Sequence, residues 1–438
     1  MNRVLIVAYY TPPLGLSGVM RVSKLCKFLP DFGWEPVILT VKPVAYYAYD
    51  QELVGDLNRA KVFRTESLDP NRVYYKLQVG GCRLRNLRTE SREQRAGMTE
   101  ETAKIGSRVR LLNFLFLPDA KIGWYPFAIS AGRKIIEDFK PQVVFATAPP
   151  WTALLIGSSL AKRFHLPFVA DFRDPWPLGF QPPPFYQRPF LKKMLKSVFA
   201  RARLVLAVNK GTKMVLERFL FSSLRCLELN TQNQEPKTIF RIELLENGFD
   251  PDEYREAKVK VEETANLEAE NGAGFRIVYV GNLFENQKEI EGFIAALSSI
   301  PDVWFYLAGS ADRKSQQRLE AQPRVKLLGK VPHQQAIAVM KGADALLYIA
   351  KPNQPVGLKL YEYLGACKPI IIWGKGADEA RELVKEFESG MACENGEELR
   401  WFIRKVRENP SRFTRGDRSR LNRRFQAQWL ARRLSSLL

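Results

Sequence analysis

Residues 352–373, PNQPVGLKLYEYLGACKPIIIW, decide how this chain folds. The pattern predicts a turn, a helix over about 357–366 and a buried strand over 369–373. A helix that leads directly into a continuous apolar strand is typical of a parallel sheet with both faces covered by helices. The stretch therefore indicates an α/β fold, and it places a loop-to-helix junction at one end of the sheet.

The same alternation of strands and helices runs through most of the chain. Continuous apolar strands are predicted over 3–10, 36–41, 143–148, 168–172 and 204–208, and five more lie between 275 and 373. Helices are predicted over 17–32, 150–164 and 188–202. This order predicts doubly wound parallel sheets.

A polar segment, 257–274, divides the pattern into two halves. It reads AKVKVEETANLEAENGAG, which is charged and ends in glycine, as a linker does. We therefore expect a first Rossmann-like domain over 1–256 and a second over 274–410. We also expect an Arg-rich helix over 411–438 that packs back on the first domain.

The bulk properties narrow the function classes. The chain has 438 residues and 46% hydrophobic content, enough for two or three packed domains. Its net charge of +20 calls for an anionic partner, such as nucleic acid, acidic lipid or a phosphorylated substrate. The opening MNRVLIVAYY shows no signal-peptide layout and no window resembles a membrane span, so we expect a cytoplasmic protein.

Metal and serine-hydrolase chemistry find little support. The only histidines are His165 and His333, and the five cysteines show no metal-binding spacing. The motif Asp250-Pro251-Asp252 lies in a turn-like sequence and is best explained as a loop-shaping element. No metal site is predicted.

The helix that begins near Gly357 offers two charged groups on one face. Lys359 and Glu362 are three residues apart, so the helix turns them the same way. The amides of Gly357 and Leu358 at the helix mouth suit a phosphate, Lys359 suits a diphosphate and Glu362 suits a sugar diol. An ordinary amphipathic helix with both charges in solvent explains the spacing equally well.

This stretch resembles the signature helix of the retaining glycosyltransferases of family four, in which two glutamates flank seven residues. Glu362 matches the second glutamate, which binds the nucleotide ribose in that family. Gln354 stands in place of the first glutamate, which contacts the donor sugar. An amide can hydrogen-bond a hydroxyl, but it supplies no negative charge near a developing cation.

A second point of resemblance follows the first strand of the second half, VYVGNLFENQK. Family members often have Gly-Arg and a later Lys here, which together hold the diphosphate. Gly281 matches, Asn282 replaces the arginine, and Lys288 is the nearest candidate for the lysine. Lys288 at a helix start also fits a plain solvated residue.

The first half resembles the acceptor side of the family at two loops. The loop YYTPPLGLSGVMR contains Gly15, Gly18 and Arg21, although a tight turn also explains its glycines. The segment VADFRDPWP places charged residues where a strand emerges. We expect Asp171 or Asp174 near the acceptor hydroxyl, with Arg173 beside them. The alternative is an Asp–Arg–Asp pairing that fixes the loop.

Two basic and apolar stretches suggest contact with an anionic membrane surface. They are 108–129, which is basic, then apolar, then aromatic, and 188–203, an amphipathic helix with many cations. In both stretches the apolar groups are also suited to the protein core.

The resemblance implies a GT-B fold of two facing Rossmann-like domains and a metal-independent hexosyltransferase without a cofactor. Such an enzyme would move a sugar from a UDP- or GDP-sugar to a lipid-linked or glycan acceptor with retention, in bacterial surface polysaccharide or glycolipid synthesis. We expect Asp171, Asp174 and Lys359 as catalytic residues, and a peripheral position on the inner face of the cell membrane. The alternative is a degenerate nucleotide-sugar-binding protein of the same fold. Nucleic-acid binding is not expected, because no stacking platform is evident.

Overall fold

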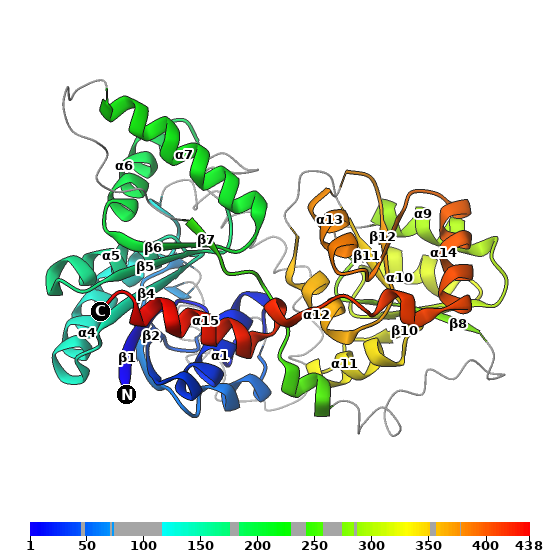
Figure 1. The fold of residues 1–438 in the computed structure, drawn as a ribbon, viewed down its shortest axis with the longest axis horizontal. Coiled ribbons are helices and arrows are strands. Elements are labelled where there is room, and N and C mark those ends of the chain that lie inside the picture. Colours follow the sequence, from blue (N-terminus) through cyan, green and yellow to red (C-terminus); the bar gives the residue numbers. More distant parts are fainter. Residues whose placement is uncertain are drawn as a thin grey trace, which may run out of the picture. The chain divides into compact units, whose positions relative to one another are not determined.

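The structure, a computed structural model, divides the chain into two compact units. The first unit combines Met1–Leu245 with Ala427–Leu438, and the second is Glu246–Gln426. Figure 1 shows the elements of both units. The structure describes residues 1–44, 49–70, 72–73, 116–175, 184–228, 242–256, 274–283, 287–350, 356–376 and 378–438.

The first unit is built on a parallel sheet of seven strands in the order β3-β2-β1-β4-β5-β6-β7. The strands are β1 (Asn2–Val7), β2 (Trp34–Val41), β3 (Lys61–Thr65), β4 (Val143–Ala148), β5 (Phe168–Phe172), β6 (Ala202–Ala207) and β7 (Ile242–Leu244). Four of the five residues of β5 and all of β4 are uncharged and buried, as a sheet covered on both faces requires. The strand order reverses direction between β1 and β4.

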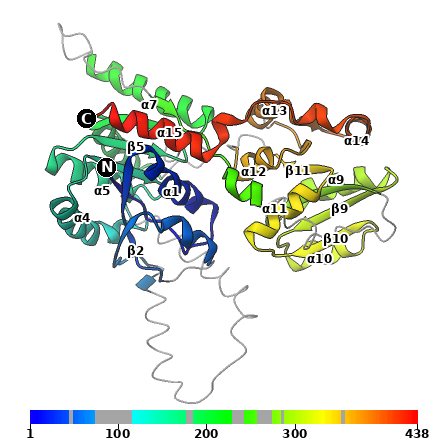
Figure 2. The same cartoon turned by 60° about the horizontal axis from the view of Figure 1, so that its bottom comes forward.

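Helices cover both faces of this sheet (Figures 1 and 2). They are α1 (Ser17–Phe28), η1 (Leu29–Phe32), η2 (Glu52–Leu57), η3 (Ile122–Trp124), α4 (Tyr125–Phe139), α5 (Thr152–Phe164), α6 (Arg188–Phe199), α7 (Lys210–Glu228) and α15 (Arg423–Ser435). One core lies between the sheet and α4, α5 and α6, and another lies between the sheet and α1 and α15. The C-terminal helix therefore contributes Leu430 and Leu434 to the core of the first unit.

The second unit has a parallel sheet of six strands in the order β10-β9-β8-β11-β12-β13. The strands are β8 (Phe275–Val280), β9 (Val303–Ala308), β10 (Val325–Gly329), β11 (Ala345–Ile349), β12 (Ile370–Trp373) and β13 (Gly390–Cys393). The helices are α9 (Gln287–Ser298), α10 (Arg313–Glu320), α11 (His333–Gly342), α12 (Leu358–Ala366), α13 (Asp378–Glu386), α14 (Gly396–Glu408), η4 (Pro410–Phe413) and η5 (Ser419–Leu421). Here too, one core lies on each face of the sheet.

The predicted fold class is confirmed, since each unit is a parallel sheet between layers of helices. The unit boundary at Leu245 precedes the expected domain end at 256. The reason is that Tyr254 packs in a core of the second unit and the Phe249 N–H donates to the Leu421 carbonyl at 3.0 Å. The expected linker, apart from Gly274, lies outside the described residues.

The two stretches for which membrane contact was an alternative contribute most of their described apolar side chains to the core, although Phe190 is exposed. The apolar face of α6, with Leu191, Leu195 and Val198, is buried against the first sheet. In the other stretch, the described part begins at 116, and Trp124 and Ala128 belong to the same core. Among the described residues, no helix combines the length and apolar character needed to cross a bilayer.

Candidate functional site

The helix α12 begins where the second sheet changes direction. Strand order runs outward from β8 on one side and from β11 on the other, so β8 and β11 form the switch point. Ligands of open α/β sheets bind outside the carboxyl ends of the strands at such a point. Gly281 follows β8 there, and α12 follows β11.

The carboxyl ends of β8 and β9 approach each other through glycine backbone. Gly281 has φ of +123°, and Gly309 has φ of +158°. A Cβ atom on Gly309 would lie 2.1 Å from the Gly281 carbonyl oxygen. Because only glycine tolerates these positions, the backbones of the two strand ends can pack closely, with no side chain on either residue.

Lys359, in the first turn of α12, reaches back over the end of β8. Its Nζ lies 3.8 Å from the centroid of the Tyr279 ring, and a Cβ on Gly281 would lie 2.7 Å from that Nζ. Burial lowers the pKa of Lys359 to about 8, and the charge of Glu362 opposes the shift. The ammonium group is thus held against the strand end, and the lysine side chain is half-buried.

Glu362 lies one turn further along the same helix and is half-buried. Burial raises the pKa of its carboxyl group, and the nearby positive charge of His333 opposes this effect. Within the described part of the chain, neither the Lys359 ammonium nor the Glu362 carboxylate forms a hydrogen bond or an ion pair. Both charges are therefore available to a ligand that carries a phosphate and a hydroxyl pair.

The mouth of α12 presents backbone amides. Gly357 precedes the helix with an extended backbone, and no side chain caps the helix. Its own N–H donates to the Tyr348 hydroxyl at 3.3 Å. The amides of Leu358 and Lys359 begin the helix and have no carbonyl partner within it, so the positive end of the helix dipole accompanies the lysine.

Residues that sequence reasoning missed hold α12 in place. The Tyr254 hydroxyl donates to the Glu362 carbonyl at 2.8 Å, and the Val280 N–H donates to the Tyr363 hydroxyl at 2.9 Å. His333 Nε2 lies 3.2 Å from a carboxylate oxygen of Glu253. Tyr363 is one residue past Glu362, but only the fold shows that it bonds to β8.

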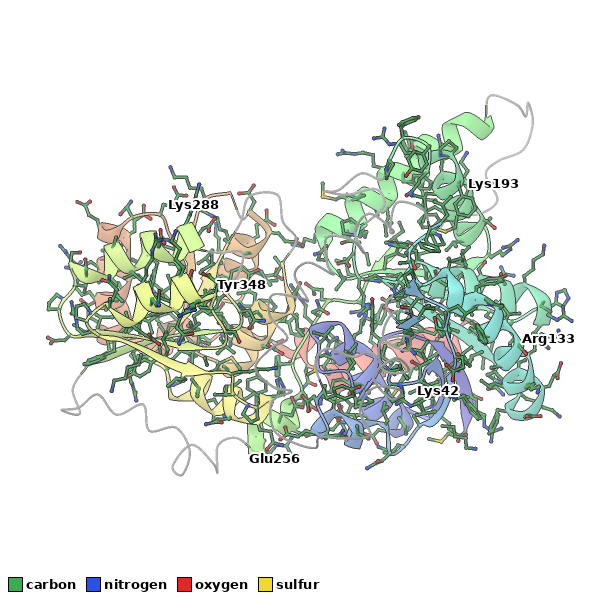
Figure 3. The ribbon with its side chains drawn as sticks, turned by 180° about the vertical axis from the view of Figure 1, so that it is seen from behind. Lys42, Arg133, Lys193, Glu256, Lys288 and Tyr348 are labelled. Carbon is green, nitrogen blue, oxygen red and sulfur yellow. The ribbon has the colours of Figure 1, made fainter. Side chains whose placement is uncertain are left out.

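The other three residues expected on the donor side differ in their positions. Asn282 is occupied in fixing the loop, because its side-chain oxygen accepts from the Ser310 N–H at 3.3 Å. Lys288 is exposed in the first turn of α9, at the periphery of the second unit in Figure 3. Gln354 lies outside the described residues. The plain solvated interpretation of Lys288 therefore fits its position.

In the first unit, Asp171 forms a buried ion pair with Arg21. The Arg21 guanidinium donates to both carboxylate oxygens, at 2.7 and 3.0 Å, and the Thr147 hydroxyl donates at 2.7 Å. The Arg21 and Asp171 side chains are only 2% and 0% exposed. The catalytic role expected for Asp171 is thus not supported, because its carboxylate is enclosed and joins α1 to β5.

Arg173 fixes the adjacent loops through backbone carbonyls. Its guanidinium donates to the carbonyls of Gly18 and of Pro149, the latter at 2.5 Å. Burial lowers the pKa of Arg173, and the charge of Asp171 opposes the shift. This arrangement resembles the loop-fixing alternative, except that the second aspartate, Asp174, interacts with Arg173 only through its charge.

Asp174 is the exposed carboxylate at this edge of the first sheet. It forms no hydrogen bond or ion pair with any residue in the described ranges. The two glycines of the first loop serve packing: a Cβ on Gly15 would lie 3.1 Å from Asp50 Cβ, and one on Gly18 would lie 3.2 Å from an Arg173 nitrogen. Among the described residues, no cluster of His, Cys, Asp and Glu could hold a metal ion.

Comparison with solved structures shows the fold shared by this chain. Sucrose-phosphate synthase from Thermosynechococcus elongatus is 14% identical with a TM-score of 0.57, covering 100% of this chain and 95% of that one. HepE from Anabaena, in complex with UDP-glucose, is 14% identical with a TM-score of 0.53, covering 99% and 96%. The N-terminal domain of a Candida albicans trehalose-6-phosphate phosphatase is 14% identical with a TM-score of 0.60, covering 100% and 97%.

Sequence comparison finds a similarity in the second unit. No curated protein sequence matches the chain. A family model described as Glycosyl transferases group 1 matches residues 274–409, which contain Gly281, Lys359 and Glu362. With its two parallel-sheet units, the chain has the GT-B fold, and residues 274–409 are similar to the glycosyltransferases of group 1.

Proposed function

We propose that this protein transfers a sugar from a nucleotide-sugar donor to an acceptor hydroxyl. The observation that carries the proposal is the pair of charges on one face of α12. Lys359 and Glu362 lie at the switch point of the second sheet, and no described residue neutralises either of them by an ion pair. The group 1 family match of the same residues and the UDP-glucose complex of HepE support this assignment.

The donor would bind with its diphosphate at the mouth of α12. The amides of Leu358 and Lys359, together with the Lys359 ammonium, would hold the phosphate oxygens, and Glu362 would accept hydrogen bonds from the ribose hydroxyls. Negative charge grows on the diphosphate as the bond to the sugar breaks. A cation and helix-end amides already fixed at that place would lower the barrier to departure.

For the stereochemistry, we propose retention, as the resemblance to family four implies. The acceptor hydroxyl would attack from the side on which the diphosphate leaves, and a phosphate oxygen would take its proton. No side-chain base is then needed, which agrees with the enclosure of Asp171. Asp174 remains the acidic group that could orient an acceptor.

For the substrates, we propose a UDP- or GDP-hexose and a lipid-linked or glycan acceptor of bacterial surface polysaccharide or glycolipid synthesis. The net charge of +20 supports an anionic acceptor and a peripheral position on an anionic membrane surface. The buried apolar face of α6 argues that such contact would be electrostatic rather than by insertion of that face.

The test is turnover of radiolabelled nucleotide sugars by Lys359→Ala and Glu362→Ala. Each variant should lose at least about tenfold in kcat/KM for the donor, since each removes a charged contact to it. Lys288→Ala is the matched control, because this exposed lysine lies in the same domain without a partner in the described residues. Wild-type turnover in both site variants would remove the assignment.

A second candidate is a nucleotide-sugar-binding protein that has lost transfer. It is favoured by Asn282, a neutral side chain held by Ser310, and by the peripheral position of Lys288. Among the described residues, these leave Lys359 as the cation of the donor site. Calorimetry would show donor binding, while long incubations would show neither transfer nor hydrolysis of the donor. Any catalytic turnover abolished by Glu362→Ala would exclude it.

A further inference from the structure

A groove on the edge of the second sheet lies outside the site described above. Its volume is about 630 Å³, and it is lined by α13, by β13 and by η4 with the residues that follow it. The helix α13 is labelled in Figures 1 and 2. None of the residues assigned to donor binding lines this groove.

The groove runs along the edge of β13 rather than over a face of the sheet. Gly390, Met391 and Ala392 are consecutive, and all three line it. Since alternate residues of a strand point to opposite faces, three in a row can border one groove only where the strand edge is open. Within the described residues, β13 pairs with β12 and ends the sheet on this side.

The strand register leaves backbone groups turned toward the groove. The Ile370 N–H donates to the Ser389 carbonyl at 2.8 Å, which fixes the residues that bond to β12. Because bonding direction alternates along a parallel strand, Ala392 directs its N–H and C=O away from β12. An extended chain lying beside β13 could bond to these groups.

Four cations and one carboxylate border the groove. Arg381 is held by the Gly374 carbonyl at 3.0 Å and by Glu394 at 2.5 Å. The other three cations are exposed, and none forms an ion pair or side-chain hydrogen bond within the described residues; they are Lys385, Arg412 and Arg415. The single acid among the lining residues is Glu388. This concentration of like charge favours an acidic ligand.

The loop that carries two of these cations is braced from behind. The buried Arg418 guanidinium donates to the carbonyls of Thr414 at 2.9 Å and Gly416 at 2.8 Å. The Phe413 ring lies 5.0 Å from the ring of Phe402. Arg412 and Arg415 therefore start from fixed backbone positions, which reduces the entropy lost when a ligand binds.

The helix dipole explains the position of only one of the three exposed cations at the groove. Lys385 lies in the last turn of α13, where a cation is favoured by the helix dipole. Arg412 and Arg415 are not in that helix, yet they border the same groove. We propose that the groove binds an acidic peptide segment of a partner protein, in an extended conformation, as an additional strand beside β13.

The test uses the full-length protein and a fluorescein-labelled peptide of alternating glutamate and valine, followed by fluorescence anisotropy at low salt. The double variant Arg412→Glu/Arg415→Glu should bind it at least about tenfold more weakly. The charge-matched control is Arg313→Glu/Lys314→Glu, which changes two exposed cations of α10 outside the groove. A second peptide of the same sequence is methylated at alternate backbone nitrogens. It keeps the charges but lacks the N–H groups for a full set of hydrogen bonds to a neighbouring strand.

The proposal predicts binding of the first peptide, loss of binding by the groove variant and little binding of the methylated peptide. It is overturned if the first peptide does not bind, or if the control variant weakens binding as much as the groove variant. Equal binding of both peptides, with displacement by inorganic pyrophosphate, would also overturn it, because the groove would then be an anion site without strand addition. Unchanged donor turnover in the groove variant keeps this result separate from the proposed transferase activity.

Discussion

Lys359 is the residue on which the donor site depends most, and its titration gives a pH prediction. Its pKa is lowered to about 8, so the ammonium form is lost as pH rises through that value. We expect kcat/KM for the donor to fall above about pH 8, where the neutral amine no longer attracts a diphosphate. Initial rates between pH 6.5 and 9.5 measure this effect.

Lys359→Arg is the control for that profile. A guanidinium stays protonated throughout the range, so whatever activity this variant keeps should not show the same alkaline fall. An identical fall in the arginine variant would show that another group titrates, and the role given to the lysine charge would be wrong.

Gly281 offers a test of the contact between β8 and the lysine. In Gly281→Ala, the new methyl group would lie 2.7 Å from Lys359 Nζ, at a φ of +123°. We expect a rise in donor KM and a loss of about 1–3 kcal/mol of stability from backbone strain. The comparison is Gly292→Ala in α9, where a methyl group meets only the Trp373 ring nitrogen at 3.9 Å. That change should leave KM unaltered.

At the scale of elements, the Arg21–Asp171 pair joins α1 to β5 and should govern the stability of the first unit. Asp171→Asn would remove the carboxylate charge that faces the buried Arg21 guanidinium, at a cost of about 3–5 kcal/mol. Urea denaturation measures this cost. Asp174→Asn should change stability by no more than about 0.5 kcal/mol, because that side chain is exposed.

The same two variants separate stability from acceptor binding. If Asp174 orients the acceptor, Asp174→Asn should raise acceptor KM while the protein stays as stable as wild type. If the asparagine variant of Asp171 were as stable as wild type, the ion pair would have no structural role in joining α1 to β5.

The sequence predicts long elements well and short edge elements poorly. The strands over 143–148 and 168–172 are confirmed as β4 and β5, because a run of consecutive apolar residues is favourable only where both faces of the strand are covered. It did not predict β7 or β13, which have only three and four residues and lie at sheet edges. So short a strand carries no periodicity, and its place is set by its neighbour.

The candidate site could be located from the sequence, but its contacts could not. The spacing of Lys359 and Glu362 on one helix is a local property and was correctly predicted as one face of α12. The partner of Asp171 lies 150 positions away, so no local pattern distinguishes a catalytic aspartate from one in an ion pair. The approach of Lys359 to Gly281 likewise depends on the pairing of β8 with β11, because α12 follows β11 in the chain.

At the scale of the whole molecule, α15 links the end of the chain to its beginning. Leu430 and Leu434 lie in the core formed by β1, β2 and α1, and Arg433 pairs with Glu243 at 2.9 Å. Leu430→Ala should therefore destabilise the first unit by about 2–5 kcal/mol. Pulsed hydrogen exchange resolved by peptide would show faster exchange in β1 and β2, with β8 and β9 unaffected. Equal acceleration in both sheets would contradict this prediction.

The first unit is discontinuous in sequence, since its last piece, Ala427–Leu438, follows the whole of the second unit. In a nascent chain leaving the ribosome, the part of the first sheet that α15 covers would stay exposed until residues 427–438 have been synthesised. Residues 246–426 are contiguous in the sequence, so the second unit could fold before residues 427–438 are synthesised. A late stop codon that removes residues 427–438 would thus destabilise the first unit, although most of that unit is synthesised first. Residues 1–245 would also depend on chaperones for the longest time.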